Sequence, residues 1–372
     1  MLNLFIFKHI EEDETISSLL RFRDEHREED YYRAARGLIE FSARRLTEKD
    51  IIKEYILRTM LEQENIPDIT TLRNFLRHDV KTIYTELLNY DWNGLFTSSG
   101  FIPMSDIETP AVPTGLAGYV QSLGAMMECE SNEALGGAIL AHAESFGTGI
   151  FAAYSALRWN KGSLTGIICP DDVSFADLTG LERQKNILIT NTEQLLLGQG
   201  GSDIILTGDA GTGKSSCVKA CLGMFKNSGL RLIEVSRDSI CDLPEIYDCI
   251  KGDLLKYIIF IDGLDDSEKE VCKVLKSVFG SRAEARKKNV LVYATSAPDA
   301  SEKVRASSLF GINLSFSSPT IDEYLNIVED MLIDRGIPMT EGIRSAAVSV
   351  QHKGEGFSAA AAKQFVDGIT GK

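Results

Sequence analysis

The sequence has no uncharged apolar run close to the roughly 20 residues that a membrane-spanning helix needs. The nearest candidate, GGAILAHAESFGTGIFAAYSALRW, contains His142 and Glu144. The amino terminus, MLNLFIFKHIEEDE, lacks the basic start and the small-residue cleavage site of a signal peptide. We therefore expect a cytoplasmic protein that does not enter a membrane.

Positive charge is also scarce. The chain has 39 Lys and Arg against 54 Asp and Glu, a formal net charge of −15 at pH 7. This balance argues against a protein that coats nucleic acid or acidic membranes indiscriminately. A local basic cluster of Arg282, Arg286, Lys287 and Lys288 keeps a nucleic-acid or acidic partner open, with a solvated loop as the alternative.

Cysteine pairs with metal-ligand spacing are absent. None of the 7 cysteines forms a CxxC pair, and the 5 histidines are scattered. The sequence therefore gives no sign of a zinc site. Cys217 and Cys221 lie one helical turn apart, where buried thiols are expected.

Pattern and composition divide the 372 residues into three regions. Residues 1–165 are expected to form a mostly α-helical N-terminal domain, because apolar residues recur at three- and four-residue spacing. Residues 170–318 should form an α/β core and residues 319–372 a further helical region, which the resemblance given below implies is a lid. Capping boxes are predicted at Thr47 with Asp50 and at Thr320 with Glu323.

Buried strands alternate with helices in the middle region. The apolar runs DIILTGD, RLIEVS, YIIFIDG, NVLVYATS and INLSF are separated by helical segments. Such alternation predicts a parallel, doubly wound sheet.

A phosphate-binding loop follows the first of these strands. GDAGTGKS, residues 208–215, matches GxxxxGK[ST] in full and precedes a predicted helix. Glycines let backbone amides surround phosphate oxygens, the lysine reaches the β- and γ-phosphates, and the serine binds Mg²⁺. The nucleotide-binding residues expected here are Gly208, Asp209, Ala210, Gly211, Thr212, Gly213, Lys214, Ser215 and Ser216.

A second acidic strand end completes the expected site. Asp262 ends KYIIFID, and we expect it to hold Mg²⁺ together with Ser215. The alternative is that Asp262 only caps the next helix. The expected ligands are ATP or ADP with Mg²⁺.

These motifs resemble the AAA+ ATPases, and several phrases resemble a bacterial AAA+ family of unknown function. The phrases are LTGLERQKNILITNTEQLLLGQ, GTGKSSCVKA, LRLIEVS, NVLVYATS, LFGINLSF and KQFVDGI. The resemblance covers about residues 170–370. It implies a sheet with strand order 5-1-4-3-2, a helical lid, ring or filament assembly, and a base contact near residues 178–181.

The chain departs from the AAA+ pattern at the positions that cleave ATP. The acid expected after Asp262 is Gly263, and the asparagine expected after Ser296 is Ala297. The arginine expected before Phe-Gly is Leu309, and Arg-Ser-Gly-Arg before the last helix is replaced by residues 357–360, FSAA.

Two functions remain open from the sequence. The first is an ATP- or ADP-binding switch or scaffold with weak or absent hydrolysis. The second is an active ATPase that remodels a protein or nucleic-acid partner, for which Asp265, Ser296 and Arg305 are the candidate catalytic residues. In either case we expect the N-terminal half to contact a protein partner.

Overall fold

The computed structural model describes residues 2–62, 72–107, 117–168, 170–250, 255–264, 269–281, 289–297, 306–351 and 357–370. They fall into two compact units. The N-terminal unit comprises residues 1–154 with 252–255, and the α/β unit comprises residues 155–251 with 256–372. The division falls at Tyr154, earlier than the boundary expected near residue 165.

The described part of the N-terminal unit is helical, as predicted. One buried core extends from Leu2 to Ala152. No helix in the described ranges combines the length and the apolar character that crossing a bilayer requires. The helices are α1 (His9–Glu12), α2 (Glu14–Glu25), α3 (Glu28–Ser42), α4 (Ile51–Glu62), α5 (Arg73–Ile83), the π-helix η1 (Tyr84–Leu88), α6 (Trp92–Ser98), η2 (Met104–Asp106), α7 (Ala117–Met127), α8 (Asn132–Phe146) and α9 (Ile150–Ala153).

The start of α4 differs from the predicted capping box of Thr47 and Asp50. Asp50 alone caps the helix, because its Oδ1 accepts the amides of Ile52 and Lys53 at 2.8 and 3.1 Å. Thr47 donates its hydroxyl to Glu54 Oε2 at 2.7 Å instead. Glu54 is fully buried, and a buried carboxylate needs donors more than the helix needs a second cap.

Asp79 fixes the N-terminal segment to α5. Its side chain is fully buried. Its carboxylate accepts the backbone N–H groups of Phe5, Ile6 and Phe7, with the Ile6 bond at 2.7 Å. These amides lie outside any helix or strand, so Asp79 supplies the partner that secondary structure does not.

We predict that Asp79→Ala lowers the free energy of unfolding by about 2–4 kcal/mol, because it leaves several partly or fully buried amides without an acceptor. Urea titration measures this loss, and hydrogen exchange should show faster exchange at residues 5–7. Glu40→Ala removes an exposed carboxylate from the same unit and should change stability by less than about 0.5 kcal/mol. Unchanged protection at residues 5–7 in Asp79→Ala would contradict the assignment.

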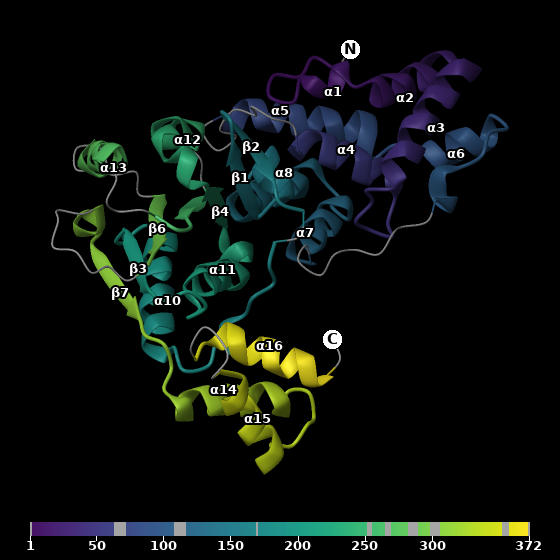
Figure 1. The fold of residues 1–372 in the computed structure, drawn as a ribbon. Coiled ribbons are helices and arrows are strands. Elements are labelled where there is room, and N and C mark those ends of the chain that lie inside the picture. Colours follow the sequence, from purple (N-terminus) through teal and green to yellow (C-terminus); the bar gives the residue numbers. More distant parts are fainter. Residues whose placement is uncertain are drawn as a thin grey trace. The chain divides into compact units, whose positions relative to one another are not determined.

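A seven-stranded sheet forms the centre of the α/β unit (Figure 1). Its order is β2-β1-β4-β5-β6-β3-β7, and all neighbouring pairs except β1–β2 are parallel. Every residue of β6 is buried, as expected where both faces of a parallel sheet are covered. The strands are β1 (Ala156–Asn160), β2 (Ser163–Gly166), β3 (Ile204–Gly208), β4 (Leu230–Val235), β5 (Lys256–Ile261), β6 (Val290–Ser296) and β7 (Ile312–Phe316).

The predicted strand order is confirmed for five strands and extended by two. Numbered along the chain from β3, the strands from β7 to β4 read 5-1-4-3-2. Residues 156–166, expected in the helical domain, form β1 and β2 at the edge beyond β4. Lys161 (φ 49°) and Gly162 (φ 88°) make the two-residue turn between them, since a type I′ hairpin needs two positive φ angles.

Helices surround the sheet and continue into the C-terminal lid. Helix α11 contacts β3, β4 and β6, and α10 packs against α11. The helices of the core are η4 (Phe175–Asp177), α10 (Glu182–Leu196), α11 (Lys214–Phe225), η5 (Lys226–Ser228), η6 (Arg237–Asp242), α12 (Leu243–Cys249), α13 (Lys269–Ser281) and η7 (Ala306–Leu309).

The lid consists of α14 (Ile321–Ile333), α15 (Glu341–Gln351) and α16 (Ala359–Thr370). It has its own buried core, which includes Tyr324, Val328 and Val366. The capping box predicted at Thr320 and Glu323 is present and starts α14. The lid therefore folds around its own contacts and follows β7 directly (Figure 1).

Candidate functional site

The loop from Gly208 to Ser215 depends on glycine at three points. Gly208, Gly211 and Gly213 have φ angles of 151°, 77° and 92°, which side chains other than hydrogen disfavour. A Cβ on Gly208 would lie 2.1 Å from the carbonyl oxygen of Phe316 at the end of β7. The loop therefore begins in direct backbone contact with the strand that leads to the lid.

Helix α11 starts at Lys214 with its first amides directed at this loop. Gly213 is its N-cap and provides no side-chain hydrogen bond. The first N–H groups of a helix lack helical partners and carry the positive end of its dipole. The loop and the helix start therefore form a site suited to an anion.

Lys214 lies across the loop. Its Nζ donates to the carbonyl oxygens of Gly208 and Asp209, both at 2.6 Å. Burial lowers the pKa of the Lys214 ammonium, and the nearby charges of Asp209 and Asp262 oppose that shift. A phosphate at the loop would supply further compensating charge to this partly buried cation.

Asp262 joins three elements at the ends of the strands. Its Oδ1 accepts the hydroxyl of Ser215 on α11 at 2.8 Å and that of Thr295 on β6 at 2.5 Å. Thr295 Oγ1 also accepts the backbone N–H of Gly263 at 2.8 Å. The structure thus brings together Ser215 and Asp262, the two residues proposed from the sequence to hold Mg²⁺.

Of the three catalytic candidates, Ser296 is the one that falls within the described residues. Ser296 is buried and lines the cavity, with its hydroxyl 3.3 Å from the carbonyl oxygen of Ala297. Gly263 has φ 74°, and a Cβ there would meet open space, so packing leaves room for a side chain that the residue lacks. Asp265, Arg305 and the basic cluster at 282–288 lie outside the described ranges.

Phe357 and Leu309 stand where the resemblance implies arginines, and both are packed against other parts of the fold. The ring of Phe357 packs against Tyr324 in the lid core, with centroids 5.0 Å apart. Leu309 is half-buried in η7. Neither position offers a charge to a phosphate.

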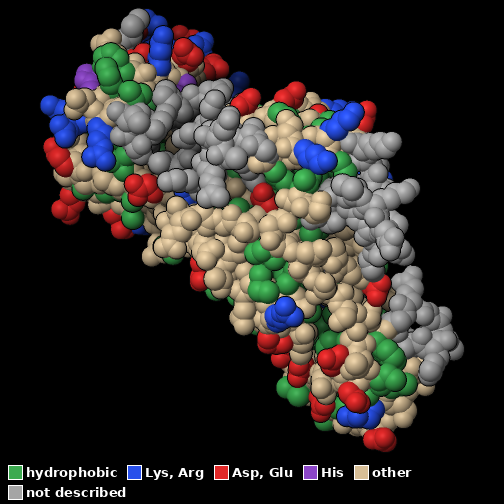
Figure 2. Space-filling view, turned by 90° about the vertical axis from the view of Figure 1, so that its left-hand side faces the viewer, with side chains coloured by type: hydrophobic (Ala, Val, Ile, Leu, Met, Phe, Trp, Pro, Cys, Tyr) green, Lys and Arg blue, Asp and Glu red, His purple; other side chains and the backbone are tan. Residues whose placement is uncertain are grey.

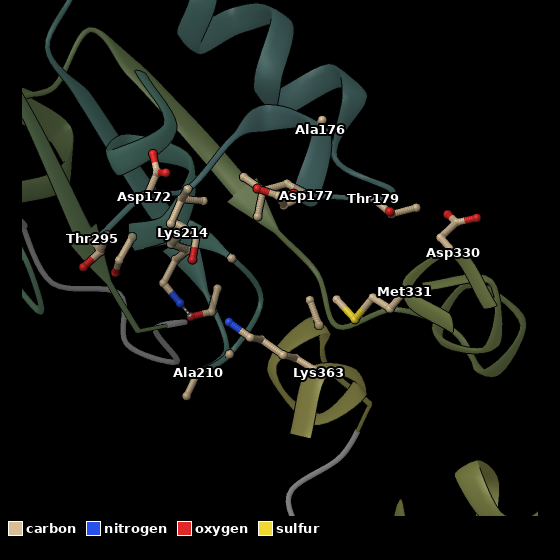
Figure 3. Close-up of a pocket in the computed structure, with 18 of the residues that line it drawn as sticks. Asp172, Ala176, Asp177, Thr179, Ala210, Lys214, Thr295, Asp330, Met331 and Lys363 are labelled. Carbon is tan, nitrogen blue, oxygen red and sulfur yellow. Dashed lines mark hydrogen bonds between the residues drawn. The ribbon is translucent and has the colours of Figure 1, made fainter. Parts of the chain in front are cut away.

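A cavity of about 910 Å³ opens over the loop, which is ample for a nucleotide. Figure 3 shows Lys214 and Thr295 on one side of it and lid residues on the other. Leu178 and Thr179, within the predicted base-contact segment, line it as well. Further residues that line the cavity belong to no sequence motif and were not predicted: Asp172, Val173, Ala176, Asp177, Asp330, Met331, Ile333, Asp334, Arg335 and Lys363.

The two helical cysteines have no role in this chemistry. Cys217 and Cys221 are fully buried, as predicted. Burial raises the pKa of each thiol to about 12, so both stay protonated at neutral pH.

The sheet order, the glycine loop and the helical lid define a P-loop protein of the AAA+ type. A family described as "Protein of unknown function (DUF815)" matches residues 152–300 and 297–372, more than half of the chain. The chain belongs to this family, which confirms the resemblance seen in the sequence.

Three solved structures show a distant likeness in fold. The FIGL-1 AAA domain in complex with ADP is 18% identical, with 52% of this chain and 71% of that chain covered and a TM-score of 0.40. A HORMA:CdnC:Trip13 complex from E. coli MS115-1 is 14% identical (52% and 89% covered, TM-score 0.38). The Aeropyrum pernix ORC1 protein in complex with DNA is 17% identical (51% and 60% covered, TM-score 0.40). Among curated proteins, none matches the chain.

We predict that Gly208→Ala destabilises the α/β unit by more than about 3 kcal/mol, because the new methyl group would overlap the Phe316 carbonyl. Thermal or urea unfolding measures the loss. Gly198→Ala is the matched control, since Gly198 also has a positive φ (68°) but open space around it, and it should cost about 1 kcal/mol. Equal losses in both variants would show that the contact with Phe316 is unimportant.

Proposed function

We propose that this chain binds ATP or ADP with Mg²⁺ and acts as a nucleotide-dependent switch or scaffold with weak or absent hydrolysis. One combined observation carries the proposal. The phosphate loop is intact and Ser215 contacts Asp262, yet uncharged residues stand at the positions where AAA+ enzymes place catalytic groups. The loop amides and Lys214 would bind the phosphates.

Mg²⁺ fits the oxygen donors at this site. The Ser215 hydroxyl and the exposed Asp262 carboxylate are hard ligands, which Mg²⁺ prefers, and nucleotide phosphates and water usually complete its shell. Within the described residues, no cluster of three or more His, Cys, Asp or Glu forms a separate metal site. The bound ion would neutralise phosphate charge, while Thr295 would keep Asp262 oriented through its 2.5 Å hydrogen bond.

We expect slow hydrolysis because the catalytic groups that are missing usually make large contributions to the rate. A transition-state arginine alone contributes about 10³–10⁵ in rate, and a positioned general base about 10²–10⁴. Nucleotide affinity depends on the backbone amides of the loop, on Lys214 and on Mg²⁺. This sequence keeps the loop, the lysine and both proposed Mg²⁺ ligands. Binding should therefore persist where cleavage does not.

The N-terminal unit is our candidate for partner binding. Phe5, Tyr32, Ile39 and Phe75 are large apolar side chains that stay between 47% and 59% exposed on it. Exposed aromatic and aliphatic groups favour a protein contact over a nucleic-acid contact. We propose a protein partner here, with assembly into a homo-oligomer and a cytoplasmic location as further parts of the same hypothesis.

An active ATPase is the competing function, and Ser296 is the described residue that favours it. Its side chain lines the cavity beside Thr295, where a hydroxyl can contact phosphate or water. Asp265→Ala, Ser296→Ala and Arg305→Ala would each lower turnover without weakening binding if these residues perform hydrolysis.

We predict that the purified protein binds ATP while turning over far below about one per second, the low end of ordinary enzymes. Lys214→Ala should weaken ATP binding by at least about tenfold, because it removes a charge-assisted contact to phosphate. Calorimetry and phosphate release measure the two quantities. Lys276→Ala, which removes an exposed lysine from α13, should change neither. Wild-type turnover near one per second that Lys214→Ala abolishes would refute the proposal.

We also predict that Asp262→Asn reduces the Mg²⁺ dependence of ATP affinity. Removal of Mg²⁺ with a chelator should weaken ATP binding to the wild type by about tenfold more than to the variant, because a neutral amide is a poorer ligand. Asp248→Asn, an exposed change on α12, should behave as wild type. If Asp262→Asn retains the full response to Mg²⁺, Asp262 is only a structural partner of Ser215 and Thr295.

A further inference from the structure

The lid contributes charged residues to the cavity, and one of them is a cation free of close partners in the described part of the chain. Arg335 is engaged in an ion pair with Asp367. Lys363 is exposed and has no hydrogen bond or ion pair with any described residue. Its ammonium is therefore the lid cation that can meet a ligand without first breaking a described contact.

Helix α16 is packed so that Lys363 faces the cavity. Ala362 and Val366 are fully buried in the lid core. Ala359 and Lys363 are four residues apart, so they share one face of the helix, and both line the cavity. Figure 3 shows the Lys363 side chain extending from α16 toward the phosphate loop near Ala210.

Acidic side chains of the lid lie away from the phosphate loop. In Figure 3, Asp330 lies near Thr179, at the end of the cavity away from the loop. Figure 2 shows acidic side chains gathered over the lid at the lower end of the view. Of the two described lid cations that line the cavity, Arg335 is paired with Asp367, and Figure 3 shows Lys363 extending toward the loop.

The field of Lys363 reaches the segment that forms another wall of the cavity. Asp171, next to the lining residue Asp172, forms an ion pair with Lys219 at 2.5 Å. Lys219 is the main cause that lowers the pKa of Asp171, and the charge of Lys363 lowers it further. The ammonium of Lys363 is therefore close enough to this wall for its charge to favour the ionised form of a carboxyl group there.

A cation on this side of the loop would meet a particular part of a triphosphate. Loop amides enclose the inner phosphates, and Lys214 reaches the β- and γ-phosphates from the base of the loop. A group that approaches from the lid meets the terminal phosphate, which the amides leave open. A diphosphate lacks that group.

We propose that Lys363 is the lid's contact to the terminal phosphate, and that this contact closes the lid on a nucleoside triphosphate but not on a diphosphate. The proposal rests on the nucleotide-binding function proposed above. In this proposal Lys363, on the next turn of α16, takes the place of the arginines that the AAA+ pattern has at 357–360. The lid then reports which nucleotide is bound.

The test compares Lys363→Ala with the wild type in the full chain, using a non-hydrolysable ATP analogue and ADP as separate probes. We expect the analogue to bind about tenfold more weakly, which corresponds to about 1.4 kcal/mol, and ADP to change by less than about twofold. Lys363→Arg should retain the preference for the analogue. Arg344→Ala, which removes an exposed lid cation on α15 that does not line the cavity, is the matched control.

Hydrogen exchange of α16 gives a second measurement. The analogue should protect α16 more than ADP does in the wild type and in Arg344→Ala, and this difference should disappear in Lys363→Ala. Equal weakening of both nucleotides, or an unchanged analogue affinity in Lys363→Ala, would overturn the inference while leaving nucleotide binding intact. A wild-type chain that binds neither probe would overturn the proposed function as well.

Discussion

One carboxylate oxygen organises the proposed site. Oδ1 of Asp262 accepts hydrogen bonds from Ser215 and Thr295, and so connects α11, β5 and β6 at the ends of the strands. Because the strands are parallel, their carboxyl ends meet at one edge, where a ligand can contact all of them. The helix start that follows the loop and both proposed metal ligands meet at this junction, and the cavity lies over it.

The phosphate loop is connected to the lid as well as to the sheet. Gly208 meets the carbonyl of Phe316 at the end of β7, and Asp209 Oδ2 accepts the hydroxyl of Ser318 at 2.9 Å. Ser318 lies between β7 and the N-cap of α14. A change in the loop on ligand binding would therefore act directly on the segment from which the lid begins.

The sequence predicted the parts of this fold that local patterns encode. Fully apolar strands such as β5 and β6, the glycine loop and the Thr320–Glu323 capping box each carry a short-range signal. The hairpin of β1 and β2 was missed because the Ala- and Gly-rich residues before it favour a continuing helix. The turn residues Lys161 and Gly162 lie between two short segments that do not read as strands by themselves. They form a hairpin because β4 at the edge of the sheet is available to pair with β1. Glu54 shows a related limit, since its burial is set by tertiary packing.

Lys363 was missed for a different reason. Comparison with the AAA+ pattern directs attention to 357–360, where the expected arginines are absent, and a lysine on the following turn has no motif of its own. Only the packing of α16 shows which face it presents.

If hydrolysis is slow, the state of the lid is set at equilibrium by the nucleotide that is bound. A ligand shifts such an equilibrium only by its difference in affinity for the two states. A tenfold difference in affinity between tri- and diphosphate that arises from one lid cation would change the closed-to-open ratio by about the same factor. Exchange of the bound nucleotide, without its cleavage, would then be enough to reset the switch.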